Sequence, residues 1–192
     1  MAETYGVEVI GVDLASSMVG IAWDRSANYP NLNVKFEIGD ITKNQFPNEH
    51  FDVIYSRDTI LHIKDKASLF SQFKKWLKPG GKVFISDYCC GPKPWSDEYA
   101  AYVESRGYNL LTVQEYGNLF ENLQFSKVVA TDVTKLFVEC LNFELKKFEQ
   151  MKQEFVGEFS AEDFNYLIDG WNAKLVRCQD GHQRWGKFYC EL

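Results

Sequence analysis

Short apolar runs alternate with stretches of helical periodicity along the first half of the chain. The runs at residues 7–13, 34–40, 51–55 and 82–87 have the length and composition of strands, and we expect the first to be buried. Ser16 and Ser17 are candidate N-caps for a helix that extends to residue 27. A second helix should cover residues 69–77, where the Lys-Pro-Gly-Gly sequence at 78–81 ends it. This rhythm favours an α/β fold with a parallel sheet and crossover helices.

The second half of the chain is richer in helical patterns. We expect helices over residues 95–106 and 112–123, and then a strand over residues 125–134. A long amphipathic helix should follow, with one apolar face made of Phe137, Leu141, Leu145, Phe148, Met151 and Phe155. Ser160 and Asp163 have the spacing of a capping box that opens a further helix, and residues 183–190 close the chain as a strand. We expect residues 1–192 to form a single domain.

The composition excludes several classes of function. The 192 residues are 45% apolar and 25% charged, as in folded proteins rather than disordered ones. A net charge of −6 disfavours a nucleic-acid partner held by its phosphates. The longest uncharged stretch, residues 14–23, is too short to cross a bilayer, and no basic start leads into an apolar run. We therefore expect neither a membrane partner nor a secretory signal.

The cysteines indicate the cellular compartment. There are five of them, an odd number, and none are paired at Cys-x-x-Cys spacing. We therefore expect neither a disulfide framework nor a metal site, and we expect a cytoplasmic location.

Acidic residues end three of the expected strands, at Asp13, Asp40 and Asp87. In open α/β sheets, ligands bind beyond the carboxyl ends of the strands, and a carboxylate there can accept both hydroxyls of an adenosine ribose. Asp40 could bind an exocyclic amine while Ile41 covers the adenine face. The alternative is that each acid only caps the turn that follows it. Two successive strands with this ending favour a nucleoside pocket.

Several motifs resemble those of a known family. Residues 11–13, 39–41, 51–58 and 77–81 resemble the later motifs of class I S-adenosylmethionine-dependent methyltransferases. More narrowly, residues 56–62, 86–89, 102–108, 169–174 and 184–186 resemble phosphoethanolamine N-methyltransferases of nematodes, protozoa and plants. The resemblance covers essentially the whole chain. It implies a Rossmann-like sheet with helical additions in the second half, an antiparallel closing strand, and S-adenosyl-L-methionine as the methyl donor.

The chain also departs from the family pattern. In that family a first strand, a Gly-rich loop and a helical lid with a catalytic tyrosine precede the segment that matches residue 1. We therefore expect the carboxy-terminal portion of the fold, with a sheet that lacks its first strand and exposes ladder groups. Three alternatives stay open for such a chain: it is an unstable fragment, it recruits a protein partner or a missing amino-terminal segment, or it is a truncated product.

The resemblance assigns roles to individual residues. It makes His62 the general base and places Asp58 near the substrate amine, and their spacing of four would put both on one face of a helical turn. It assigns the substrate phosphate to Tyr88, Tyr102, Arg106, Tyr108 and Lys174. The donor would contact Asp13, Leu14, Asp40, Ile41, Ser56 and Arg57. The simpler alternatives are a structural histidine, a solvated arginine beside core tyrosines, and a lysine that extends outward.

Three functions follow, in order of preference. The first is N-methylation of phosphoethanolamine, or of its mono- and dimethyl forms, towards phosphocholine. The second is a non-catalytic remnant that serves as a binding or interaction module. The third, a nicotinamide dehydrogenase, shares the acid after the second strand but leaves the motif at residues 57–62 and the phosphate cluster unexplained.

Overall fold

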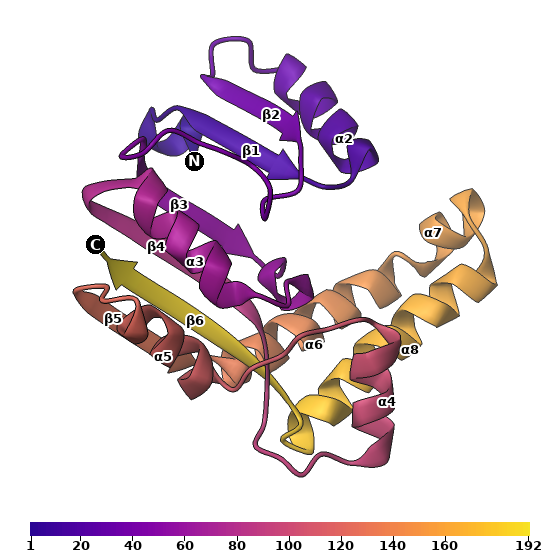
Figure 1. The fold of residues 1–192 in the computed structure, drawn as a ribbon. Helices are drawn as coiled ribbons and strands as arrows, with labels where there is room; N and C mark the ends of the chain where they lie inside the picture. The colour runs from indigo at the N-terminus through magenta and orange to yellow at the C-terminus, as the bar shows by residue number, and fades with distance from the viewer. The chain divides into compact units, whose positions relative to one another are not determined.

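The computed structural model describes all residues from 1 to 192, and they form two compact units. Unit 1 is Met1–Pro47 and unit 2 is Asn48–Leu192. Strands alternate with helices along the chain, as expected for an α/β protein (Figure 1). The strands form two separate sheets, whereas the sequence predicts one. β1 pairs only with β2, and β3 pairs only with β4, so no strand links the two sheets by hydrogen bonds. The assignment of residues 1–192 to a single domain stays a prediction.

Unit 1 contains a parallel pair of strands and a covering helix. The elements are α1 (Ala2–Tyr5), β1 (Val9–Asp13), α2 (Ser16–Ala27) and β2 (Val34–Ile38). The expectation that the first strand is buried is wrong, because β1 is only half-buried: within the unit, α2 alone packs against the sheet. The expected N-cap is also wrong. Ala15 holds that position, and the Asp13 carboxylate accepts a hydrogen bond from its backbone N–H.

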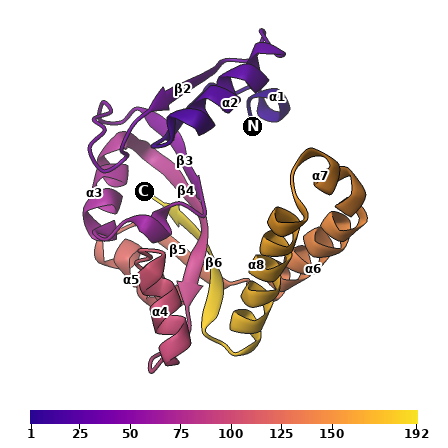
Figure 2. The same cartoon turned by 90° about the vertical axis from the view of Figure 1, so that its right-hand side faces the viewer.

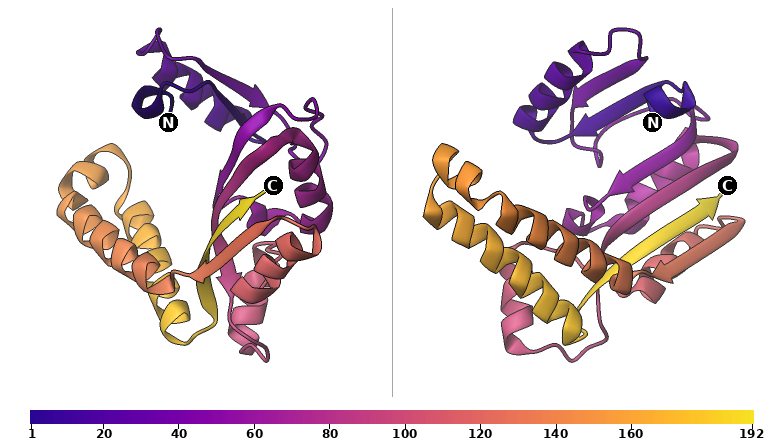
Figure 3. Two further views of the ribbon diagram at one scale, coloured as in Figure 1. Left: turned by 90° about the vertical axis from the view of Figure 1, so that its left-hand side faces the viewer. Right: turned by 180° about the vertical axis from the view of Figure 1, so that it is seen from behind.

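Unit 2 is built on a mixed four-stranded sheet. Its strands are β3 (Phe51–Arg57), β4 (Leu77–Cys90), β5 (Lys127–Asp132) and β6 (Gln183–Glu191), in the order β3-β4-β6-β5 (Figure 3). β3 runs parallel to β4, and β6 runs antiparallel to both β4 and β5, which confirms the antiparallel closing strand. β4 is longer than expected: it begins at Leu77, so residues 78–81 belong to the strand.

Helices lie on both sides of this sheet (Figure 2). One side carries α3 (Lys66–Trp76) and α5 (Val113–Asn122), and the other carries α6 (Thr134–Gln150), α7 (Lys152–Glu158) and α8 (Ala161–Gln179). The remaining elements are the 3-10 turn η1 (Ile60–His62) and α4 (Asp97–Ser105). The single long helix expected after residue 134 is instead two helices, because the chain leaves the helical path at Met151. No helix is long and apolar enough to cross a membrane.

Aromatic rings hold α3 and α5 against the sheet. Phe70 of α3 stacks on Phe120 of α5, with ring centroids 4.2 Å apart. Tyr116 of α5 stacks on Phe188 of β6 at 4.1 Å. These four side chains are completely buried, so their desolvation stabilises the unit.

A buried carboxylate lies beneath this aromatic layer. Asp87 of β4 is fully buried, and its Oδ2 accepts a hydrogen bond of 3.2 Å from the Tyr116 hydroxyl. Burial raises the pKa of Asp87 to about 7, although the nearby ammonium of Lys66 opposes this shift. A carboxyl group that is easier to protonate in the folded chain than in the unfolded one makes folding pH-dependent.

We predict that the Asp87→Asn variant is more stable than the unsubstituted chain at pH 8. Folding favours the protonated acid, so this contribution to the free energy of unfolding is present at acid pH and is lost as pH rises through about 7. Urea unfolding at pH 5 and pH 8 should give a difference between the two pH values that is smaller in the variant, by on the order of 2 kcal/mol. The exposed Asp169→Asn variant is the control. Identical pH dependence in all three chains would contradict the prediction.

Candidate functional site

The carboxyl ends of β3 and β4 position the first group of site residues. Asp58 follows directly after β3, and its backbone N–H donates to the Ser86 carbonyl of β4 at 2.8 Å. Its φ of +51° is in the left-handed region, which a residue with a Cβ adopts at some cost. The neighbouring strands therefore hold Asp58 in an uncommon turn, which fits a site residue better than a simple connection.

A tryptophan from the end of the chain holds the Asp58 carboxylate. Trp185 of β6 donates its indole N–H to Oδ1 of Asp58 at 2.8 Å, and its ring packs against Phe137 at 5.1 Å. Burial raises the pKa of Asp58, whereas the Trp185 hydrogen bond and the charges of Arg57 and Lys174 act in the opposite direction. The carboxylate is thus desolvated and partly compensated.

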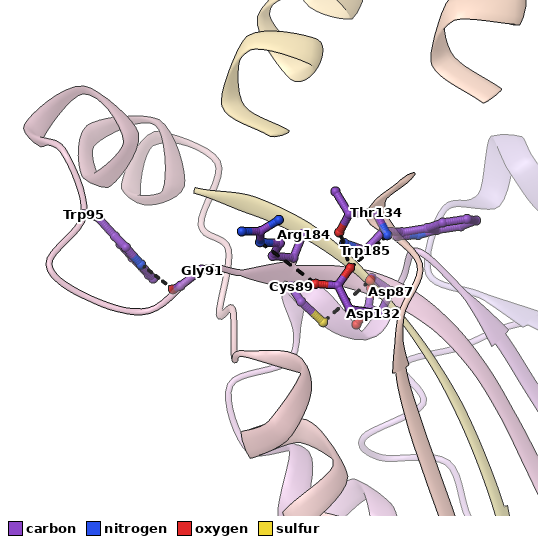
Figure 4. Close-up of polar contacts among 8 residues, drawn as sticks. All are labelled: Asp87, Cys89, Gly91, Trp95, Asp132, Thr134, Arg184 and Trp185. Atoms are coloured by element: carbon purple, nitrogen blue, oxygen red, sulfur yellow. Dashed lines mark hydrogen bonds and ion pairs between the residues drawn. The ribbon is translucent and has the colours of Figure 1, made fainter. Parts of the chain in front are cut away.

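Trp185 is itself anchored by its backbone. Its N–H donates to Oγ1 of Thr134, whose own N–H and hydroxyl donate to the Asp132 carboxylate (Figure 4). Arg184 lies within ion-pair distance of the same carboxylate, at 4.0 Å. The start of α6 and the end of β5 therefore fix the strand that presents the indole to Asp58.

His62 closes the turn η1 and is exposed. Its ring meets that of Tyr108 edge-on, with centroids 5.2 Å apart. The expectation that Asp58 and His62 share a helical turn is wrong, because Asp58 is left-handed and η1 has only three residues. The two side chains contact different residues instead. The Asp58 carboxylate accepts a hydrogen bond from Trp185, and the His62 imidazole packs against Tyr108.

The three predicted tyrosines lie together. The ring centroid of Tyr108 is 5.9 Å from that of Tyr102 in α4 and 6.4 Å from that of Tyr88 in β4. Burial raises the pKa of Tyr88, and burial together with Tyr102 raises the pKa of Tyr108 to about 12. At neutral pH these phenols therefore keep their protons and can act as hydrogen-bond donors.

Cations surround the phenols. Arg106, at the C-cap of α4, has its guanidinium carbon 6.0 Å from the Tyr102 ring, and its pKa is raised by the Tyr166 hydroxyl and by Tyr108. Lys174 of α8 is half-buried, and its pKa is lowered by burial and then by repulsion from Arg177. Like charges crowded into a desolvated place favour binding of an anion, because an anion relieves both costs.

Arg177 completes this cluster, and the sequence reading missed it. Its guanidinium carbon lies 3.8 Å from the Tyr102 ring centroid, and its Nε donates to Oε1 of the buried Gln183 at 3.0 Å. The available signal was its spacing of three from Lys174 on a helix, which puts both on one face. Trp185 was also missed as a site residue, although residues 184–186 were noted as a motif.

The predicted donor-binding residues divide between the two units. Asp13, Leu14, Asp40 and Ile41 lie at one edge of the unit 1 sheet, because β1 and β2 are parallel and in register up to Asp13 and Ile38. Ser56 and Arg57 lie at the end of β3 in unit 2.

Both acids of unit 1 cap the turns after their strands, as the simpler alternative predicts. Asp13 accepts from the Ala15 N–H, and Asp40 accepts from Thr42 and pairs with Lys43 at 3.0 Å. The Thr42 and Lys43 contacts lower the pKa of Asp40 to about 2. Carboxylates beside apolar side chains, here the 74% exposed Leu14, are also a donor set that suits a nucleoside, so the residues fit such a group.

Comparisons with known proteins relate the chain to methyltransferases. A family model described as a methyltransferase domain matches residues 1–85. Phosphoethanolamine N-methyltransferase 1 of Zea mays is 52% identical over 98% of this chain and 37% of its own length. The phosphoethanolamine N-methyltransferase of Plasmodium falciparum is 40% identical over 97% of this chain and 70% of its own length. The chain therefore spans less than two fifths of the maize relative.

A solved structure agrees with this pattern. Phosphoethanolamine N-methyltransferase 2 of Haemonchus contortus, in complex with phosphomonomethylethanolamine and S-adenosylhomocysteine, superposes with a TM-score of 0.95. It is 33% identical in sequence, and the match covers 99% of this chain and 45% of that one.

We predict that Trp185→Phe raises the pKa of Asp58 further, because the indole N–H favours the ionised carboxylate. The pKa can be measured by carbon-detected NMR titration of the Asp58 carboxyl group. The lost hydrogen bond should also reduce the free energy of unfolding by on the order of 1 kcal/mol.

The matched control is Trp171→Phe, which removes an indole hydrogen bond of 3.4 Å to Glu144. This variant should leave the pKa of Asp58 where it was. A pKa of Asp58 that is equal in the Trp185→Phe variant and in the unsubstituted chain would show that the indole does not tune the carboxylate.

Proposed function

The chain belongs to the phosphoethanolamine N-methyltransferase family, and we propose that it acts in S-adenosylmethionine-dependent N-methylation of phosphoethanolamine, or of its mono- and dimethyl forms, towards phosphocholine. The observation that carries this proposal is the gathering of cations and phenols beside His62 and Asp58. Such a site offers one end to a phosphate and the other to an amine, which are the two functional groups of these substrates.

The phosphate end is formed by Arg106, Lys174 and Arg177 with the hydroxyls of the nearby tyrosines. Guanidinium groups match phosphate oxygens with paired donors, and phenols that stay protonated add further donors. Three cations suit an anion with about two negative charges, as in a phosphomonoester. Binding relieves the repulsion that Arg177 exerts on Lys174, so the site is stabilised by the ligand it selects.

The amine end is formed by Asp58 and His62. An alkylammonium group with a pKa near ~10 has no free electron pair and must lose a proton before it can accept a methyl group. Imidazole can take that proton near neutral pH, and the Asp58 carboxylate attracts the cationic form of the amine. Anchoring at both ends holds the nitrogen in place, and such positioning can supply ~7–11 kcal/mol of the barrier.

S-adenosyl-L-methionine supplies an electrophilic methyl group when it is bound. We assign its contacts to Asp13, Leu14, Asp40, Ile41, Ser56 and Arg57. The two carboxylates would accept hydrogen bonds from the ribose and adenine, and the two apolar side chains would cover the adenine face. The position of the acids at the carboxyl ends of parallel strands supports this assignment.

A cytoplasmic location is part of the same proposal. All five cysteines are free thiols, and Cys140 is exposed. Exposed free thiols are typical of a reducing compartment, which supports this location.

We predict that the chain binds phosphocholine in a calorimetric titration and that Lys174→Met weakens this binding about tenfold or more. This substitution removes a half-buried cation and its hydrogen-bond donors from the phosphate end. Arg177→Gln should weaken binding in the same direction. The control, Lys146→Met, removes an exposed lysine of α6 and should leave the dissociation constant unchanged. Equal affinities in all four chains would remove the phosphate site.

We predict that His62→Ala reduces turnover of phosphoethanolamine about 100-fold or more, the usual size of a lost general base. Transfer of labelled methyl from S-adenosylmethionine measures turnover, and phosphocholine affinity should change less than about threefold. His50→Ala, an exposed histidine before β3, is the control. Parallel losses of turnover and affinity would exclude His62 as the base. Phosphocholine binding without any transfer by the unsubstituted chain would instead favour a non-catalytic binding module.

A further inference from the structure

Lys66 at the start of α3 is a buried lysine whose ammonium group binds only main-chain oxygens. Its side chain is 4% exposed. Nζ donates to the carbonyl oxygens of Ile60 at 2.9 Å, Ile63 at 2.6 Å and Asn109 at 2.7 Å. An ammonium group has three hydrogens, so these bonds use all of them. One acceptor is the first residue of η1, the second follows His62 at the end of η1, and the third is the residue after Tyr108.

Asn109 ties the same two segments together from the other side. Its backbone N–H donates to the Leu61 carbonyl at 2.7 Å, and its side-chain amide donates to the carbonyls of His62 at 3.3 Å and Gly107 at 3.2 Å. We call Lys66 and Asn109, with these bonds, the Lys66–Asn109 clamp. The clamp joins two segments that are distant in the sequence, since Lys66 and Asn109 are 43 residues apart.

The clamp makes His62 and Tyr108 parts of one rigid piece. The carbonyls before and after His62, of Leu61 and Ile63, are linked to Asn109 directly or through Lys66, and the rings of His62 and Tyr108 are in edge-on contact at 5.2 Å. The main chains that carry the two rings cannot move apart without breaking bonds to a buried ammonium group, which would then lack acceptors.

We propose that the Lys66–Asn109 clamp fixes the distance between the amine end and the phosphate end of the site, and so selects the length of the carbon chain between amine and phosphate in the substrate. This rests on the proposed function, in which His62 serves the amine and Tyr108 the phosphate. One added methylene would displace the amine from His62 when the phosphate is held, and a misplacement of about 1 Å can cost about 100-fold in rate. Lys66 and Asn109 are then positioning residues, which act through His62 and Tyr108.

The burial of a lysine at this place supports a role beyond packing. Burial lowers the pKa of Lys66, which means that the charged form costs free energy here, although the Asp87 carboxylate reduces this cost. An apolar side chain would fill the space without that cost, but it would take the Lys66 donor away from all three carbonyls, and Ile60 would keep only the bond from the Ile63 N–H. The ammonium group is the side-chain group that can satisfy three converging carbonyls at once.

The test compares the affinities of phosphoethanolamine and 3-aminopropyl phosphate, measured by calorimetry on the full chain. The unsubstituted chain should prefer phosphoethanolamine about tenfold or more. Lys66→Met should reduce this preference to less than about threefold. Asn109→Ala, which keeps the Lys66 bonds, should reduce it to the same extent, and it tests the proposal even if the Lys66→Met variant does not fold. Lys74→Met is the matched control, because Lys74 of α3 donates to the Leu123 carbonyl away from this site. It should retain the full preference.

The other outcomes overturn the proposal in distinguishable ways. If the Lys66 and Asn109 variants weaken the binding of both ligands equally and leave the preference for phosphoethanolamine unchanged, the clamp has only a structural role. An unsubstituted chain that binds both ligands with equal affinity would overturn length selection while leaving the proposed function standing. An unsubstituted chain that binds neither would overturn the proposed function, and with it the clamp.

Discussion

The antiparallel pairing of β6 with β4 is the constraint on which the site depends. It sets Trp185 directly opposite Tyr88, so the indole from the end of the chain reaches the Asp58 carboxylate next to β4. The strand also follows α8 after a short connection, and Gln183, its first residue, accepts the hydrogen bond that orients Arg177. One strand thus positions the carboxylate at one end of the site and a cation at the other. A register shift by one residue would turn Trp185 to the opposite face of the sheet, and the hydrogen bonds of Trp185 to Asp58 and of Arg177 to Gln183 would be lost.

Much of the fold could be predicted from the sequence, because its elements have strong local signals. Ser160 caps α8 as expected, and α5 lies within the helix expected over residues 112–123; the antiparallel closing strand was implied by the family resemblance. The errors occur where local patterns say nothing of neighbours. Periodicity continues through Met151 although the helix does not, since an apolar spacing is also satisfied by two helices with a break between them. Whether β1 and β3 pair, which they do not, is likewise a tertiary property that no local pattern encodes.

The site was predictable in its residue types and less so in its geometry. The family motifs contain Tyr88, Tyr102 and Tyr108, whose rings gather as a cluster, and they contain Lys174, whose charge acts on Asp58. The motifs do not reveal which groups support them. Arg177 stacks on Tyr102, and Lys66 joins η1 to the segment after Tyr108. These contacts to main chain and rings are made across the fold, so they leave no motif in the sequence.

The two ends of the proposed site differ in a way that fits successive methylation of the proposed substrates. The phosphate of the proposed substrates stays the same, and it is at the phosphate end that the cations Arg106, Lys174 and Arg177 gather beside buried or half-buried phenols. Under the proposed function, the amine end must accept a nitrogen that gains a methyl group at each step. It is served by His62, which is exposed, and by Asp58, whose side chain retains 31% of its accessible surface. Since Lys66 and Asn109 bind only the main chain around His62, their bonds hold its backbone and do not themselves restrain the imidazole. A fixed backbone with a ring that these bonds do not restrain can keep one distance constant and still accommodate a growing amine.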